Sequence, residues 1–221
     1  MRTRVLFFLT VAFIALPQAL ASQDVAVAAR IGTLGFGGEL ALGVSEKLVI
    51  RGGVGSLIVD YTSDFDDLEY TITPPSVTGN VGIDFYPLGG WFRLMAGLMF
   101  QGGNWEAVSG PLSDYSDSIE IGDGEYDEDG ELSGTLESNS TAPYLGLGFG
   151  HHTRGGFGVF MDFGLAFMGE PNLTFTATGD IASVPGINDD LLKEAEDIEE
   201  DMGAYFEYWP ILSLGLKIPF G

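Results

Sequence analysis

Seven segments of the chain alternate between apolar residues and small or polar residues with a period of two. This period is typical of β-strands, because successive side chains of a strand point to opposite faces of the sheet. The segment 92–101 places Phe92, Leu94 and Leu98 on one face, and Arg93 and Gly97 on the other. The remaining segments are 33–42, 48–58, 80–85, 144–149, 157–167 and 212–220. The pattern therefore predicts an all-β protein.

The two faces of these strands differ in an unusual way. One face is uniformly apolar and often bulky, whereas the other carries glycine and occasional charges. Glycine accounts for 33 of 221 residues, about twice its usual share. A transmembrane barrel directs its bulky apolar face to lipid and its small or polar face inward. We therefore predict a transmembrane antiparallel up-and-down β-barrel, with outer-membrane lipid around it.

The number of strands is set by a general property of such barrels. Single-chain bacterial barrels have an even number of strands, so the seven segments predict a barrel of eight. The eighth strand is either 172–179, where Thr174, Thr176 and Thr178 alternate with other residues, or a segment before Gly32. The sequence leaves both alternatives open.

The segments between the strands fall into two classes. Three are short turns, and three, at 61–69, 102–133 and 170–203, are long loops. In barrels the short turns are usually periplasmic and the long loops extracellular. Within the third loop, apolar residues recur at helical spacing over 188–203. We therefore expect one short acidic helix in a long loop.

The first 21 residues have the features of a secretory signal peptide. Arg2 and Arg4 precede an apolar run, and Ala19-Leu20-Ala21 forms a small-x-small cleavage site. The apolar run has about 12 residues, whereas about 20 are needed to span a bilayer. We therefore expect a signal peptide at 1–21 and a mature barrel at 22–221, located in the cell outer membrane of a Gram-negative bacterium.

The charge of the chain excludes one class of partner. Its formal net charge is −23, and nucleic-acid binding needs lysine and arginine against the phosphates. The chain also has no cysteine, so disulfides do not stabilise the exported protein. Most acidic residues lie in 60–69, 106–137 and 189–201, which are outside the predicted barrel strands.

The inward faces of the predicted strands carry both signs of charge. Charges in a narrow lumen must be paired or hydrated. The set has three acidic and three basic members, which would allow either a closed, salt-bridged lumen or a polar path. Its members are Glu39, Arg51, Asp84, Arg93, Asp162 and Lys217.

One acidic stretch suggests two kinds of site in the second long loop. Carboxylates at near-alternate positions occur in calcium sites, but this stretch lacks the full spaced loop of an EF-hand. A field of one sign also raises the local concentration of cationic solutes. The residues are Asp123, Glu125, Asp127, Glu128, Asp129 and Glu131. Calcium is the only cofactor that the sequence suggests, and the sequence does not establish a metal site.

Catalytic residues are not evident. His151 and His152 are the only histidines. No serine or acidic residue lies at a spacing from them that indicates a catalytic arrangement. We therefore expect no enzymatic activity. The last predicted strand ends at Phe220, and outer-membrane barrels commonly end on an aromatic residue that the barrel-insertion machinery reads.

Several segments resemble the CarO family of carbapenem-resistance-associated outer-membrane proteins. They are residues 32–38 (GTLGFGG), 142–150 (APYLGLGFG), 169–175 (GEPNLTF) and the acidic helical run before Tyr208-Trp209-Pro210. The resemblance implies an eight-stranded barrel without a wide open pore, and uptake of basic amino acids such as ornithine. The leading hypothesis is therefore porin-like, narrow passive transport of small cationic solutes. The alternative is a structural or surface-interaction barrel with a closed lumen.

Overall fold

The computed structural model describes residues 24–58, 60–65, 68–114 and 118–220. Eight antiparallel strands form a closed barrel in the order β1-β15-β13-β12-β7-β6-β3-β2. Each barrel strand pairs with the barrel strands that come before and after it in the sequence, and the first pairs with the last. The barrel strands are β1 (Val25–Gly32), β2 (Phe36–Ser45), β3 (Leu48–Ser56), β6 (Val77–Phe85), β7 (Phe92–Gly102), β12 (Thr141–Phe149), β13 (Gly158–Phe167) and β15 (Tyr208–Phe220). The predicted eight-stranded up-and-down barrel is therefore confirmed.

The structure decides which segment is the eighth strand. It is β1, which precedes Gly32 and closes the barrel by pairing with both β2 and β15. The other alternative, Asn172–Gly179, is also a strand, β14, but it pairs with β11 in a separate sheet. A tight turn joins β1 to β2, in which Gly35 has a φ of +78° and donates its N–H to the Gly32 carbonyl at 2.9 Å. Glycine accepts this positive φ without strain.

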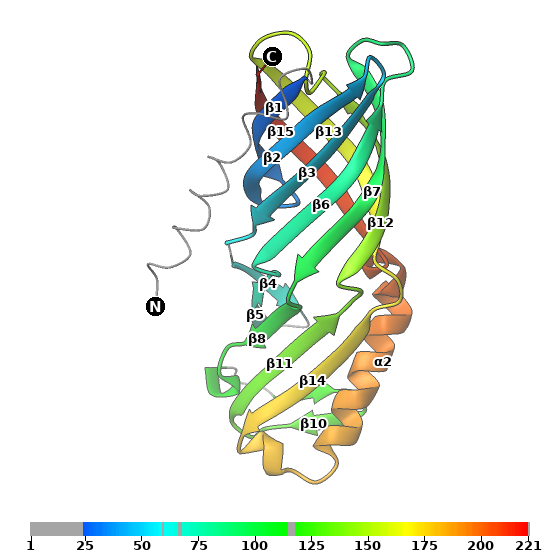
Figure 1. The fold of residues 1–221 in the computed structure, drawn as a ribbon. Coiled ribbons are helices and arrows are strands. Elements are labelled where there is room, and N and C mark those ends of the chain that lie inside the picture. The colour runs from blue at the N-terminus through cyan, green and yellow to red at the C-terminus, as the bar shows by residue number, and fades with distance from the viewer. Residues whose placement is uncertain (1–23, 59, 66–67, 115–117, 221) are drawn as a thin grey trace.

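Beyond the barrel, the long loops form a second sheet (Figure 1). Its five strands have the order β14-β11-β8-β5-β4. They are β4 (Tyr61–Phe65), β5 (Leu68–Thr73), β8 (Trp105–Ser109), β11 (Gly130–Glu137) and β14 (Asn172–Gly179). A small hairpin of β9 (Ile119–Ile121) and β10 (Gly124–Tyr126), the 3-10 helices η1 (Leu112–Asp114) and η2 (Ile181–Ser183), and the helix α2 (Ile187–Phe206) complete this part. We call these elements together the extension.

The extension corrects the expectation that 61–69, 102–133 and 170–203 are loops. Each range contains at least one strand, whereas the sequence predicts there only the helix and, as one alternative for the eighth barrel strand, the segment 172–179. That helix is confirmed and is longer than predicted, because it spans Ile187–Phe206 rather than 188–203. Among the residues that the structure describes, no helix is long and apolar enough to cross a bilayer.

The two faces of the barrel wall are as the alternation predicts. Leu94, Leu98, Phe163 and Leu214 are 38 to 49 % exposed on the outer surface. Exposed aromatic residues flank this apolar band at both ends. Four of them lie toward the extension, namely Phe36, Phe100, Phe167 and Tyr208. Trp91, Phe157 and Phe220 lie toward the opposite end, where the short turns join β2 to β3, β6 to β7 and β12 to β13. An apolar band between two aromatic girdles is typical of transmembrane barrels.

Glycine on the inner face makes room for large side chains in the lumen. Gly97 pairs with Gly82 across β6 and β7, and the buried Tyr144 ring lies over this pair. A Cβ atom on Gly97 would lie 2.2 Å from the Val81 carbonyl oxygen and 2.8 Å from Cε1 of Tyr144. The position therefore has no space for another side chain.

We expect Gly97→Ala to lower the free energy of unfolding by about 1–3 kcal/mol, because overpacking forces neighbouring groups to move. Urea titration of the protein in detergent micelles, followed by tryptophan fluorescence, measures this change. The matched control is Gly90→Ala, because a Cβ atom there meets nothing within 4 Å. Equal stability of the two variants would contradict the packed interior.

Candidate functional site

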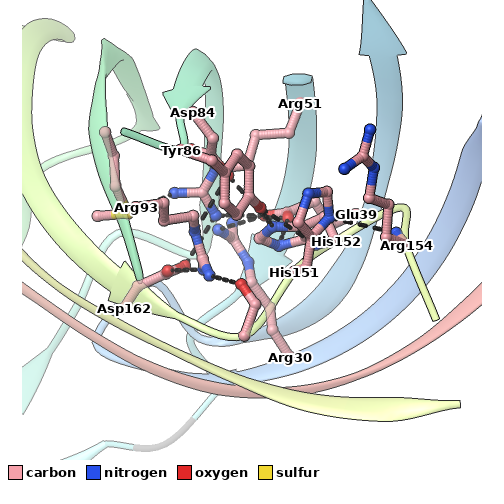
Figure 2. Close-up of polar contacts among 12 residues, drawn as sticks. Arg30, Glu39, Arg51, Asp84, Tyr86, Arg93, His151, His152, Arg154 and Asp162 are labelled. Atoms are coloured by element: carbon pink, nitrogen blue, oxygen red, sulfur yellow. Dashed lines mark hydrogen bonds and ion pairs between the residues drawn. The ribbon is translucent and has the colours of Figure 1, made fainter. Parts of the chain in front are cut away.

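The lumen contains a network of buried charged side chains drawn from seven places in the chain (Figure 2). Every member is at most 3 % exposed. The members are Arg30 on β1, Glu39 on β2, Arg51 on β3, Asp84 on β6, Arg93 on β7, Asp162 on β13 and His152 in the turn between β12 and β13. We call this set the lumen network.

Arg51 is the centre of the lumen network, because its guanidinium reaches all three carboxylates. Its Nη1 lies 2.7 Å from Asp162 Oδ2 and 3.3 Å from Glu39 Oε2, and its Nε lies 3.0 Å from Asp84 Oδ1. The contact with Asp162 crosses the lumen from β3 to β13. Arg51 therefore joins opposite walls of the barrel.

Arg93 makes a second bridge between the same two aspartates. Its Nε lies 3.1 Å from Asp84 Oδ2, and its Nη2 donates to Asp162 Oδ1. Its Nη1 donates to the backbone carbonyl of Gly150. The neighbouring Gly148 is required for this position, because a Cβ atom there would lie 2.6 Å from the guanidinium Cζ. Arg93 is wholly buried.

His152 connects two carboxylates at the short-turn end of the lumen network. Its Nε2 lies 3.0 Å from Glu39 Oε1 and its Nδ1 lies 3.2 Å from Asp84 Oδ2. The Tyr86 hydroxyl accepts a hydrogen bond from the His152 backbone N–H at 3.1 Å. The Tyr86 ring stacks on His151, with centroids 4.0 Å apart. The two histidines, which the sequence leaves without a role, therefore lie at the short-turn rim of the lumen network.

One predicted member, Lys217, does not contact the lumen network, and two members, Arg30 and His152, were not predicted. Lys217 is buried, but its Nζ donates to the backbone carbonyl of Arg154 near the short turns. Arg30 takes the third cationic place, with Nη1 3.6 Å from Glu39 Oε2. Its Nε and Nη2 are buried without a hydrogen-bond partner. Arg30 could not be predicted from the sequence because it lies on β1, and the sequence leaves open whether that segment is a barrel strand.

Apolar clusters close the lumen network on both sides. Toward the short turns, the cluster consists of Ala26, Ala41, Val49 and Tyr86. Toward the extension, a larger cluster fills the lumen. Its buried members are Leu34, Met95, Met99, Ala142, Tyr144, Ala166, Met168, Trp209 and Ile211. The charged groups therefore have little contact with bulk water, and their pairing must offset a large desolvation cost.

The extension has its own apolar core, between its sheet and α2. The core contains Leu112, Ile121, Tyr126, Leu132, Ile181, Ile187 and Leu191. At its edge, the Tyr126 hydroxyl donates a hydrogen bond to Asp190 of α2. This bond raises the pKa of Tyr126 to about 12. The extension is therefore a packed structure rather than a set of solvated loops.

The six predicted acidic residues do not lie on one loop. Glu125 is on β10 and Glu131 is on β11, and all six side chains are exposed. Asp123 pairs with Lys193 of α2, which raises the pKa of that lysine. Asp129 accepts the backbone N–H groups of Ser113 and Gly130, which lower the pKa of its carboxyl. The other two, Asp127 and Glu128, lie between β10 and β11.

No converging set of metal ligands is found in this stretch. Within the described part of the chain, no group of three or more His, Asp or Glu side chains is arranged to hold a metal ion. Calcium binding by the acidic stretch stays a prediction.

The fold is similar to that of known outer-membrane proteins. The crystal structure of CarO from Acinetobacter baumannii is 18 % identical, covers 88 % of this chain and 97 % of its own, and has a TM-score of 0.62. CarO2 from the same organism is 20 % identical, covers 89 % and 98 %, and has a TM-score of 0.63. A major outer membrane protein from Thermus thermophilus is 16 % identical, covers 90 % and 100 %, and has a TM-score of 0.47.

The sequence matches no protein-family model and no curated protein. The similarity to the two CarO structures confirms the resemblance that the sequence motifs suggest, for the fold of an eight-stranded barrel.

Proposed function

We propose that the protein is an outer-membrane barrel with a closed lumen, which holds the extension rigidly at the cell surface. The observation that carries this proposal is the lumen network, whose three carboxylates, three arginines and one histidine are all at most 3 % exposed. In this proposal the network is a structural plug, and His152 has no catalytic role.

The membrane location is supported by the outer surface of the barrel and by the fold similarity to CarO. The apolar band has the composition that lipid requires, and aromatic residues lie at both of its edges. By the usual orientation of bacterial barrels, the short turns face the periplasm and the extension faces outward. We further propose that the barrel-insertion machinery recognises β15, which ends at Phe220.

A closed lumen follows from the cost of opening it. An ion crossing the barrel would have to displace Arg51 or Arg93 from its carboxylates and also pass the apolar cluster toward the extension. Separating a buried ion pair leaves uncompensated charges, which costs about 3–5 kcal/mol. We therefore expect no steady conduction through the folded protein.

Conductance in a planar bilayer tests this proposal. The protein should give no stable single-channel steps, because buried charged and apolar side chains fill the lumen. The variant Arg93→Ala/Asp162→Ala removes one cation and one anion together but leaves the apolar cluster toward the extension in place, so it should also give no stable steps. Heat-modifiable migration on gels confirms that each sample is folded. Stable steps with the unaltered protein would contradict the closed lumen.

Uptake of small cationic solutes is the second candidate function, and the acidic surface of the extension favours it. Such a field raises the local concentration of ornithine, lysine or arginine. Liposomes that contain the protein decide between the two functions. Uptake of ornithine faster than glutamate, with a preference that shrinks as salt shortens the Debye length from about 10 Å at 0.1 M to about 3 Å at 1 M, would replace the closed-lumen proposal.

A further inference from the structure

The five-stranded sheet of the extension has one covered face and one open face. The covered face packs on the apolar core under α2, through residues that include Tyr70, Leu132, Phe175 and Ala177. The opposite face is formed by the alternate residues of the same strands. Its residues are Thr62, Asp64, Glu69, Thr71, Thr73, Glu106, Val108, Glu131, Ser133, Thr135, Glu137, Asn172, Thr174, Thr176 and Thr178. We call this surface the open face.

The strand register arranges hydroxyl groups on the open face in rows. One row crosses all five strands, through Thr176, Ser133, Val108, Thr71 and Thr62. A second row crosses four strands, through Thr174, Thr135, Glu106 and Thr73. Neighbouring strands lie about 4.8 Å apart, and alternate residues of a strand lie about 6.7 Å apart. The hydroxyls therefore form a two-dimensional array, which is interrupted by Val108 in the first row and by Glu106 in the second.

Most of the hydrogen-bonding capacity of this array is unused. Thr174, Thr176 and Thr178 are exposed, and their hydroxyls make only long contacts within the sheet. Thr176 Oγ1 lies 3.4 Å from the Ser133 carbonyl and Thr178 Oγ1 lies 3.4 Å from the Glu131 carbonyl. Each hydroxyl can donate one hydrogen bond and accept two. The array can therefore bind a partner that is rich in both donors and acceptors.

The charges on the open face restrict the chemistry of such a partner. Glu106, Glu131 and Glu137 are exposed there, and the face carries no lysine or arginine among its described residues. Phosphate groups would be repelled by these carboxylates. Lipid tails would leave the hydroxyls and carboxylates unsatisfied. An uncharged polyhydroxylated chain avoids both costs.

The position of the open face identifies the partner that lies next to it. Trp105 of the covered face packs on the cluster that closes the lumen, so that face continues the inside of the barrel. The open face consequently continues the outer wall, beyond the aromatic residues Phe100 and Phe167. If the barrel lies in an outer membrane, as proposed above, this height is occupied by the sugars of the surrounding glycolipid.

We propose that the open face binds uncharged sugars of the polysaccharide carried by the outer-leaflet glycolipid. This inference rests on the proposed membrane location. The threonine and serine hydroxyls exchange hydrogen bonds with sugar hydroxyls, and the glutamates reject the phosphorylated part of the glycolipid. The barrel is thereby held in the polysaccharide layer as well as in the bilayer.

Binding of a free polysaccharide tests the proposal without a membrane. The probe is the neutral polysaccharide released from smooth lipopolysaccharide, titrated onto the detergent-folded full chain by biolayer interferometry. The variant Thr135→Val/Thr174→Val/Thr176→Val/Thr178→Val removes four hydroxyls and keeps β-branched side chains, which suit strands. We expect its affinity to fall at least tenfold. The control Ser118→Ala/Ser183→Ala removes two exposed hydroxyls of the extension that lie outside the five-stranded sheet, and it should bind as the unaltered chain does.

A measurement on the unaltered chain covers the case that the fourfold variant does not fold. Saturation with the same polysaccharide should slow amide hydrogen exchange in β11 and β14 and leave β9 and β10 unchanged. The proposal is overturned if the folded chain binds no neutral polysaccharide, if the fourfold variant binds it equally well, or if only phosphorylated core oligosaccharide with Mg²⁺ binds. Cell fractionation is read separately, so that failure of the membrane location is not mistaken for failure of sugar binding.

Discussion

Replacing Arg51 with methionine should lower the free energy of unfolding by about 3–5 kcal/mol, because it leaves buried carboxylates without their shared cation. Arg51 contacts Glu39, Asp84 and Asp162 within 3.3 Å. No other cation of the lumen network contacts all three. Urea unfolding in phospholipid vesicles, followed by tryptophan fluorescence and by heat-modifiable migration, measures the loss.

Arg154→Met is the matched control for this experiment. The Arg154 side chain is 39 % exposed, and it pairs at 3.6 Å with Glu46, which is 88 % exposed. Exposed pairs of this kind contribute about 0–1 kcal/mol, and the backbone carbonyl that Lys217 contacts is unchanged by the substitution. If both variants lost the same stability, the lumen network would have no special energetic role.

Leu214→Arg should lower the stability of the membrane-inserted barrel by about 2–4 kcal/mol, which is the cost of arginine near the midplane of the lipid-facing surface. Leu214 lies at the middle of β15 and is 49 % exposed on the outer wall. The loss should be seen as a lower yield of heat-modifiable protein and a lower urea midpoint in vesicles.

A leucine-to-arginine substitution in the extension is the control that separates the effect of lipid from the effect of the added charge. Leu192 on α2 is 60 % exposed, so Leu192→Arg introduces the same charge outside the apolar band. In a water-soluble protein the two substitutions would have similar, small effects. Only contact with a bilayer makes Leu214→Arg the more costly variant, and similar losses would therefore argue against the membrane location.

The barrel strands and their facing could be predicted from the sequence because lipid and lumen impose opposite requirements on alternate residues. In β7, Leu94 faces the outer surface, whereas Arg93 and Gly97 face the lumen. The sequence alone therefore distinguishes the two faces of this strand. The assignment fails at β1, where Val25-Ala26-Val27-Ala28-Ala29 offers little contrast between its faces. Arg30 was not predicted for this reason. Lys217 was correctly predicted to face inward, but its Nζ contacts the Arg154 carbonyl rather than the lumen network.

The extension was not predicted because its alternation is between hydroxyl groups and modest apolar residues. In β14, Thr174 and Thr176 alternate with Phe175 and Ala177, which predicts a strand but does not show whether that strand belongs to the barrel or to a separate sheet. The place of His152 is also beyond sequence reasoning. It lies in a turn, and only the closed barrel brings the turn over Glu39 and Asp84.

The origin of the lumen network from six strands has a consequence for the pathway of assembly. Arg51 on β3 finds Asp162 only after β13 has been placed, and Arg30 on β1 enters the lumen only when β1 has paired with β15. A half-formed sheet in a bilayer would present these charges to hydrocarbon, which costs several kcal/mol for each. Intermediates with an open seam are therefore energetically disfavoured. The seam between β1 and β15 should close while water still fills the interior, so that unfolding within the bilayer is all-or-none and the opening of that seam determines the lifetime of the native state.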